Sequence, residues 1–129
     1  IVAPASANEN RKDIRDGFRA KIKTIRDERK RTIVENLDKR FAEVNAKRTA
    51  EMGKHLDKMT KILGRDIPEI QKAREANTAQ AAKVYTITIT TEKNLKMDVG
   101  NVRSQLEADL KAVHELVKAA REAVRVVIK

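Results

Sequence analysis

The fold is decided by the stretch Ile62-Leu63-Gly64-Arg65-Asp66-Ile67-Pro68-Glu69, near the middle of the 129-residue chain. Gly64 can adopt the left-handed conformation that commonly ends a helix. Asp66 can cap a following helix with Glu69 as its capping-box partner, and Pro68 suits a first turn, where its missing N–H is not needed. We therefore predict that one helix ends before this glycine and that an antiparallel one begins after Asp66. The alternative is a kink within one continuous helix.

Upstream of this turn, apolar residues recur at steps of three and four from about Glu9 to Leu63. The stripe consists of Ile14, Phe18, Ile22, Ile25, Ile33, Leu37, Phe41, Val44, Met52, Leu56, Met59 and Leu63. This spacing predicts a single helix of roughly 55 residues, about 80 Å long, whose apolar face is interrupted by Arg29 and Arg48.

Downstream of the turn, helical spacing continues through mostly small side chains, which lets two helices approach closely. These residues are Ile67, Ile70, Ala73, Ala76, Ala81 and Val84. The segment Val84–Thr90 then alternates with period two and is rich in β-branched residues, which is typical of a strand. No other stretch offers a partner strand, so we expect an extended or irregular linker here. The alternatives are a helix imposed by tertiary context, or a strand that pairs with a second copy of the chain.

The last segment has the most regular spacing in the sequence. Thr91 is a candidate N-cap, followed by the acidic Glu92. An a/d-type heptad seam then follows, made by Leu95, Val99, Val102, Leu106, Leu110, Val113, Val117, Ala120, Val124 and Val127. This pattern predicts a coiled-coil-like helix from about Glu92 to near the end of the chain.

Together these elements predict an all-α fold, namely an elongated antiparallel hairpin of long helices with a break near residues 85–91 in the second arm. The alternative is a three-helix bundle, in which the break reverses the chain again. We expect residues 9–129 to form a single elongated helical domain. Because a lone hairpin has only one seam, we also expect a homo-oligomer or a helical protein partner.

The chain begins with small residues that include Ala5-Ser6-Ala7, the small-x-small pattern that signal peptidase recognises. We expect residues 1–8 to be the remnant of a signal peptide, which implies a secreted, periplasmic or cell-surface protein. The alternative is a disordered leader.

Composition bounds the functions that the chain can perform. Charged residues make up 37% of the chain and aromatic residues 2%, and the formal net charge is +10. Such an excess of positive charge attracts acidic polymers, nucleic acid or anionic lipid without selecting among them. Cysteine is absent, which excludes disulfides and thiol chemistry in this sequence. No apolar run approaches the roughly 20 residues of a membrane span.

The densest basic stretch runs from Arg19 to Arg31 and contains only two acidic residues. Its candidate polyanion-binding residues are Arg19, Lys21, Lys23, Arg26, Arg29, Lys30 and Arg31. Such residues can neutralise an anionic partner, or they can form a solvated helix face whose stems cover the edge of an apolar seam.

Catalytic patterns are missing from the sequence. His55 and His114 have no second His or Cys at ligand spacing, and Asp109 and Glu115 lie among Lys and Arg, which favours ion pairs. No glycine-rich phosphate cradle occurs. We therefore predict a protein that is not an enzyme, with no catalytic residue, metal site or cofactor.

Several short patterns occur along nearly the whole chain in a consistent order. They are Phe18-x-x-Lys21, Ile25-Arg26-Asp27-Glu28-x-Lys30, Asn45-x-x-Arg48-Thr49, Leu56-x-x-Met59, Lys83-x-Tyr85-x-Ile87, Glu92-x-x-Leu95-Lys96, Val99-Gly100, Asp109-Leu110 and Ala120-Arg121-x-Ala123-Val124. In these the chain resembles an uncharacterised family of secreted, helix-rich proteins of the Patescibacteria, or Candidate Phyla Radiation. The resemblance implies export and a helical architecture and brings no catalytic residues. The chain differs from the family in its short central turn, where a longer linker is expected.

Three functions are compatible with these features. The first is an exported structural or interaction protein of the cell envelope that binds protein or an acidic polymer through a basic helical surface. The second is a periplasmic chaperone-like binder of unfolded clients, and the third is a nucleic-acid-binding protein.

Overall fold

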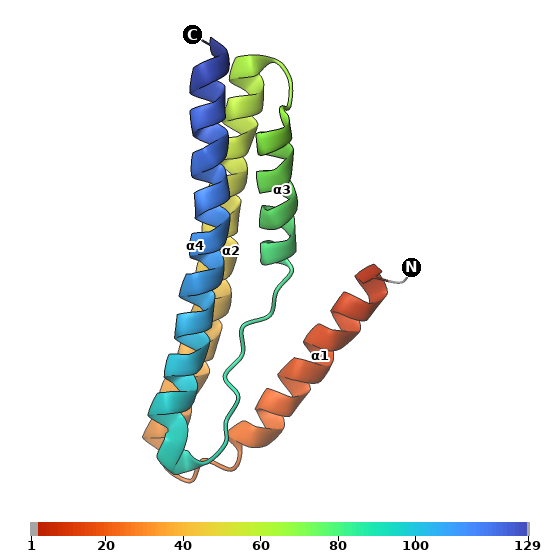
Figure 1. Ribbon diagram of the computed structural model, residues 1–129. Helices are drawn as coiled ribbons and strands as arrows, with labels where there is room; N and C mark the ends of the chain where they lie inside the picture. Colours follow the sequence, from red (N-terminus) through yellow and green to blue (C-terminus); the bar gives the residue numbers. More distant parts are fainter. Residues whose placement is uncertain (1–2, 129) are drawn as a thin grey trace. The chain divides into compact units, whose positions relative to one another are not determined.

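The computed structural model describes the backbone of residues 3–128 and the side chains of residues 12–128. Within that range the chain forms α1 (Ala3–Ile22), α2 (Glu28–Leu63), α3 (Pro68–Ala81), the short 3-10 helix η1 (Glu92–Asn94) and α4 (Leu95–Ile128), and no strand (Figure 1). The predicted all-α class is therefore confirmed. The predicted leader, residues 1–8, begins outside the described residues and overlaps the first turns of α1.

The chain divides into two compact units, which are described separately. Unit 1 comprises Ile1–Glu43 and Val84–Leu106, and unit 2 comprises Val44–Lys83 and Glu107–Lys129. Each of the two long helices, α2 and α4, contributes its first part to unit 1 and its second part to unit 2. The expected single domain over residues 9–129 stays a prediction.

The predicted helix stop and restart lies in unit 2 and is confirmed. Gly64 has a φ of 73° and ends α2, with its N–H 2.8 Å from the carbonyl oxygen of Thr60. Pro68 is the first residue of α3. The predicted Asp66 cap is wrong, because Ile67 holds the capping position and makes no side-chain capping bond. Asp66 instead accepts a hydrogen bond from the Thr60 hydroxyl.

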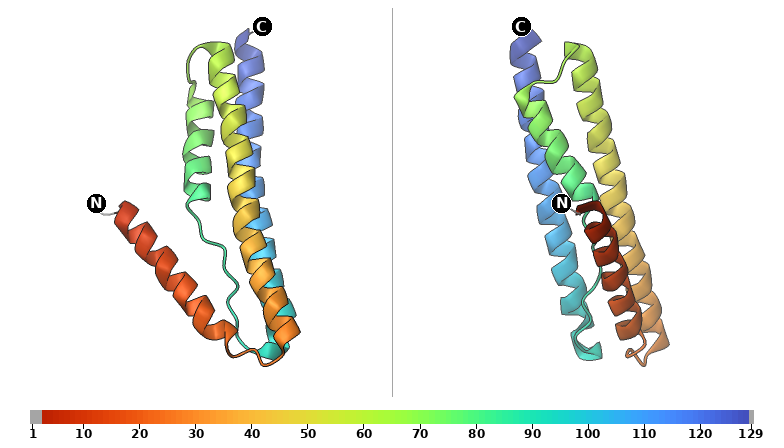
Figure 2. Two further views of the ribbon diagram at one scale, coloured as in Figure 1. Left: turned by 180° about the vertical axis from the view of Figure 1, so that it is seen from behind. Right: turned by 90° about the vertical axis from the view of Figure 1, so that its right-hand side faces the viewer.

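The hairpin of α2 and α3 is joined in unit 2 by polar side chains. Asn45 donates to the backbone oxygen of Gln80 at 3.1 Å and accepts from the Gln80 amide at 3.0 Å. Four residues further along α2, the Thr49 backbone oxygen accepts from Asn77 at 2.9 Å. A side-chain β-carbon at Gly53 would lie 3.6 Å from the Asn77 amide, so this glycine marks a close approach between the helices. Figure 2 shows α3 beside the second part of α2 in both views.

The chain reverses a second time before α4. In unit 2, Lys83 pairs with Asp109 at 3.5 Å, and α4 runs antiparallel to α3 (Figure 1). The break near residues 85–91 therefore sends the second arm back, as in the three-helix alternative. Three helical segments share the apolar core of this unit, whose most buried residues include Leu56, Ile70, Ala73, Val117 and Ala120.

The predicted single helix over residues 9–63 is wrong, because the helix stops at Ile22 and resumes at Glu28 in unit 1. Two short polar side chains bond to local backbone at this interruption. The Thr24 hydroxyl donates to the Lys21 carbonyl oxygen at 2.6 Å. The Asp27 carboxylate accepts the N–H groups at the start of α2, with distances of 2.9 and 3.2 Å, and so caps that helix.

The expected extended linker is confirmed in unit 1, where residues 84–91 have no regular secondary structure. Its alternating pattern has a structural meaning, since Tyr85, Ile87 and Ile89 are buried in this unit. Two buried carboxylates accept backbone N–H groups of the linker, which a neighbouring strand would do in a sheet. Asp38 of α2 accepts the Ile87 N–H at 2.9 Å, and Asp98 of α4 accepts the Thr90 N–H at 2.9 Å.

Candidate functional site

The seven basic residues that the sequence singles out do not lie on one continuous helix. Arg19 and Lys21 belong to the last turn of α1. Lys23 and Arg26 lie in the connection, and Arg29, Lys30 and Arg31 begin α2. All seven fall in unit 1. The expected helix face is therefore a helix–loop–helix corner.

These cations differ in how far they are already used by the fold. Arg31 is half-buried, and its guanidinium donates to the Ile25 carbonyl oxygen at 2.8 and 3.1 Å, which fixes the corner. Arg19 has a long contact of 3.9 Å with Asp16. Lys21, Lys23, Arg26 and Arg29 are exposed. The corner thus presents positive charge to solvent, while Arg31 serves the structure.

The reversal before α4 adds cations that are distant in sequence to this corner of unit 1. Glu92 connects η1 to the corner between α1 and α2. One of its carboxylate oxygens accepts the Arg26 backbone N–H at 2.5 Å, and the other lies 4.0 Å from the Lys30 ammonium. Lys93, Lys96 and Arg103 follow Glu92 along η1 and α4. Sequence reasoning missed these three residues, since only the direction of α4 brings them near Lys30. We call Lys30, Lys93, Lys96 and Arg103 the basic rim.

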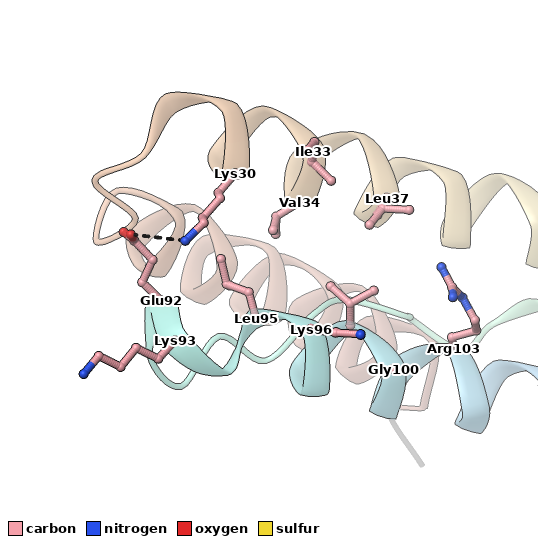
Figure 3. Close-up of a pocket in the computed structure, with 11 residues that line it drawn as sticks. Lys30, Ile33, Val34, Leu37, Glu92, Lys93, Leu95, Lys96, Gly100 and Arg103 are labelled. Atoms are coloured by element: carbon pink, nitrogen blue, oxygen red, sulfur yellow. Dashed lines mark ion pairs between the residues drawn. The ribbon is translucent and has the colours of Figure 1, made fainter.

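A groove of about 410 Å³ lies within unit 1, between the first parts of α2 and α4 (Figure 3). Its apolar lining consists of Ile33, Val34, Leu37, Leu95 and Val99. Its border is the basic rim, together with Glu92. The site therefore combines apolar surface with an excess of positive charge, which suits a partner that is both apolar and acidic.

Gly100 contributes to the depth of this groove. It lines the groove wall from α4, and a β-carbon built there would meet no atom within 4 Å. The space beside this glycine is therefore open. Glycine inside a helix costs about 1 kcal/mol relative to alanine, so Gly100 is not explained by helix stability.

A second cavity of about 420 Å³ lies in unit 1 between α1 and α2. Arg15 and Asp38 border it, and they pair with each other at 2.5 Å. The same carboxylate accepts the Thr86 hydroxyl at 2.7 Å and the Ile87 N–H. These groups hold the extended linker in place, so this cavity is better explained by structure than by ligand binding.

The remaining candidates for chemistry lie apart in the structure. His55 and His114 are exposed residues of unit 2, on α2 and α4. The ion pairs predicted for Asp109 and Glu115 are confirmed, with Lys83 at 3.5 Å and Lys118 at 3.8 Å. In the described part of the chain, no three His, Cys, Asp or Glu side chains come together as a metal ion would require.

No helix within the described residues is both long and apolar enough to cross a membrane. The expected homo-oligomer or helical partner stays a prediction, as does the expected export.

Comparisons of the chain with protein-family models, with curated proteins and with solved structures found no match. The resemblance to a secreted family of the Patescibacteria therefore remains an expectation from the sequence.

Proposed function

We propose that this chain is a non-enzymatic interaction protein that binds an acidic partner through two surfaces of unit 1. These are the exposed cations of the corner between α1 and α2, namely Lys21, Lys23, Arg26 and Arg29, and the basic rim. The observation that carries the proposal is the juxtaposition of Lys30 with Lys96 and Arg103 around one groove, although these residues are far apart in sequence. Clustered cations raise the rate of encounter with an acidic surface and favour it over neutral ones.

An acidic protein or polymer fits this surface better than single-stranded nucleic acid does. The chain has three aromatic residues, and all of them, Phe18, Phe41 and Tyr85, are buried. Proteins that bind single-stranded nucleic acid usually stack bases on exposed aromatic rings, and no such ring is offered here. Contacts to phosphate alone would remain. Nucleic-acid binding is therefore the second function that the test below includes.

The expected export to the cell envelope is part of the proposal and rests on the Ala5-Ser6-Ala7 pattern and on the resemblance to a secreted family. An envelope location would supply acidic polymers and the acidic faces of other proteins as partners. The chaperone-like alternative predicts a different result, namely suppression of client aggregation at stoichiometric amounts of this protein.

The test measures binding of the full chain to poly-L-glutamate and to duplex DNA over a range of salt concentrations. The variant Lys30→Gln/Lys93→Gln/Lys96→Gln neutralises part of the basic rim. Its matched control, Lys58→Gln/Lys61→Gln/Lys111→Gln, removes the same charge from exposed lysines of unit 2.

We expect the rim variant to bind poly-L-glutamate about tenfold more weakly than the control variant, because exposed ion pairs contribute about 0.2–1 kcal/mol each. Salt should weaken binding of the unmodified chain more steeply than binding of the rim variant. Equal losses in the two variants would contradict the proposal. Tight binding to DNA with none to poly-L-glutamate would favour the nucleic-acid alternative.

A further inference from the structure

The groove between α2 and α4 has an exposed apolar side chain at its mouth. Ile33 is 57% exposed, although it lies beside Val34, which is almost completely buried. Leu37, one turn further along α2, is half-buried. Ile33 and Leu37 are four residues apart, so they lie on the same face of α2 and expose apolar surface there.

The charges that line the groove are unbalanced, with four cations and one carboxylate, Glu92. Figure 3 shows the Arg103 side chain extending from α4 into the gap between α2 and α4, whereas Lys93 points away from it; Lys96 lines the groove from α4. Glu92 is the acidic residue of the border and is paired with Lys30 at one end of the groove. Lys96 and Arg103 therefore line the groove with no other carboxylate among its lining residues.

The shape of the groove favours a helix over a small molecule. A small ligand usually buries most of its surface in a pocket, whereas this groove is open to solvent at Ile33, which is 57% exposed. Two helices form its walls, and a third helix can lay an apolar ridge between them. On α2 the lining runs from Lys30 to Leu37, which is two helical turns or about 11 Å.

We propose that this groove binds an acidic amphipathic helix of a partner protein. The apolar stripe of that helix would cover Ile33 and Leu37, and its flanking carboxylates would pair with Lys96 and Arg103. The inference rests on the proposed function, because it names the kind of acidic partner. Gly100 leaves room for the incoming side chains, since a β-carbon there meets open space.

The probe is a synthetic helical peptide of about 14 residues, roughly 21 Å long, with leucine at three- and four-residue steps and glutamate elsewhere. A scrambled peptide of the same composition controls for charge. The informative variant is Gly100→Leu, which fills the groove with a residue of higher helix propensity. The matched control is Gly17→Leu, because Gly17 lies in α1 and also has no atom within 4 Å of a built β-carbon.

Fluorescence anisotropy with labelled peptide measures affinity, and circular dichroism measures folding of each variant. We expect Gly100→Leu to lower the affinity for the amphipathic peptide at least tenfold while leaving poly-L-glutamate binding within twofold. Gly17→Leu should bind both probes as the unmodified chain does. The scrambled peptide should bind at least tenfold more weakly than the amphipathic one.

Equal binding of the two peptides, or unchanged peptide affinity in Gly100→Leu, would overturn the groove assignment. The proposed function would then still hold if the rim variant bound poly-L-glutamate more weakly than its control. If the two variants bound poly-L-glutamate equally, both the groove assignment and the proposed function would be refuted. If Gly100→Leu melted earlier than the unmodified chain, Ile33→Gln would decide the question. Ile33 is exposed, so its replacement tests the apolar contact without disturbing the core, and unchanged affinity would again overturn the assignment.

Discussion

Replacement of Asp38 should reveal how an extended segment without a partner strand is held in an all-helical protein. The Asp38 side chain is 1% exposed and pairs with Arg15 at 2.5 Å. It also accepts the Thr86 hydroxyl at 2.7 Å and the Ile87 backbone N–H at 2.9 Å. Asp38→Ala removes all three interactions, and Asp38→Asn keeps one acceptor of nearly the same shape.

The expected losses follow from the three partners. Breaking a buried charge pair costs about 3–5 kcal/mol, and the lower end applies to Asp38→Ala because Arg15 is 36% exposed and can be rehydrated. Asp38→Asn can still accept from the Ile87 N–H but loses the charge, so we expect a cost of about 2 kcal/mol. Arg15→Gln leaves the bonds to the extended segment intact but removes the cation from a buried carboxylate; because glutamine can still donate to that carboxylate, we expect a smaller cost of about 1–2 kcal/mol.

Urea unfolding measures the order of these three losses. With a urea slope of about 1–3 kcal/mol per molar, Asp38→Ala should lower the midpoint by roughly 1–3 M. Amide hydrogen exchange then locates the effect. The Ile87 amide should exchange much faster in Asp38→Ala than in Arg15→Gln, because only the first variant removes its acceptor.

Two results would refute this reasoning. If Arg15→Gln destabilised the chain as much as Asp38→Ala, the carboxylate would act mainly as an ion-pair partner. If the Ile87 amide stayed equally protected in Asp38→Ala, the carboxylate would not be its acceptor in solution.

Two further predictions concern the hairpin of unit 2. Gly64→Ala should destabilise the chain by about 1–2 kcal/mol, because Gly64 has a positive φ, whereas Gly17→Ala in the helical α1 should be neutral or stabilising by up to about 1 kcal/mol; thermal melts of the two variants compare them directly. Asn45→Leu and Gln80→Leu should each cost about 1–3 kcal/mol, because each removes a hydrogen bond between two buried side chains, and the double variant should cost less than the sum of the two single losses in a double-mutant cycle.

The sequence was most informative where one residue type has a single structural explanation. Gly64 and Pro68 identified the central turn, and the structure shows the positive φ and the first-turn proline that this interpretation requires. The β-branched alternation of residues 84–90 also predicted the extended linker correctly. Its direction was not predictable, because a break without Gly or Pro does not specify whether the next helix continues or returns.

The corner between α1 and α2 was missed for a physical reason. Ile22 and Ile25 keep helical spacing and are both buried, so the apolar stripe continues across residues that are not helical. The available signal was weaker and polar, namely Thr24 and Asp27, whose side chains bond to nearby backbone and compete with the helix. Arg31 adds two bonds to the Ile25 carbonyl oxygen, which no local pattern predicts.

The sequence-based prediction also missed the buried polar residues of α2. Asp38, Asn45 and Thr49 occupy buried positions of α2 at helical spacing, yet their polarity placed them outside the predicted apolar stripe. Each bonds to a group contributed by a distant segment or, for Thr49, also by its own preceding turn. A buried polar group is stable only with such partners, and the partners become visible only when the topology is known.

The buried carboxylates and the groove are connected through the direction of the chain. Asp98 accepts both the N–H and the hydroxyl of Thr90, and so bonds the end of the extended linker to the start of α4 within unit 1. Glu92, between them, bonds to the Arg26 backbone. These contacts fix the start of α4, from which Lys96 and Arg103 line the groove beside α2. The binding surface that we propose therefore depends on the acidic side chains that fix the direction of α4, which explains why the basic stretch alone predicted only Lys30 of the basic rim.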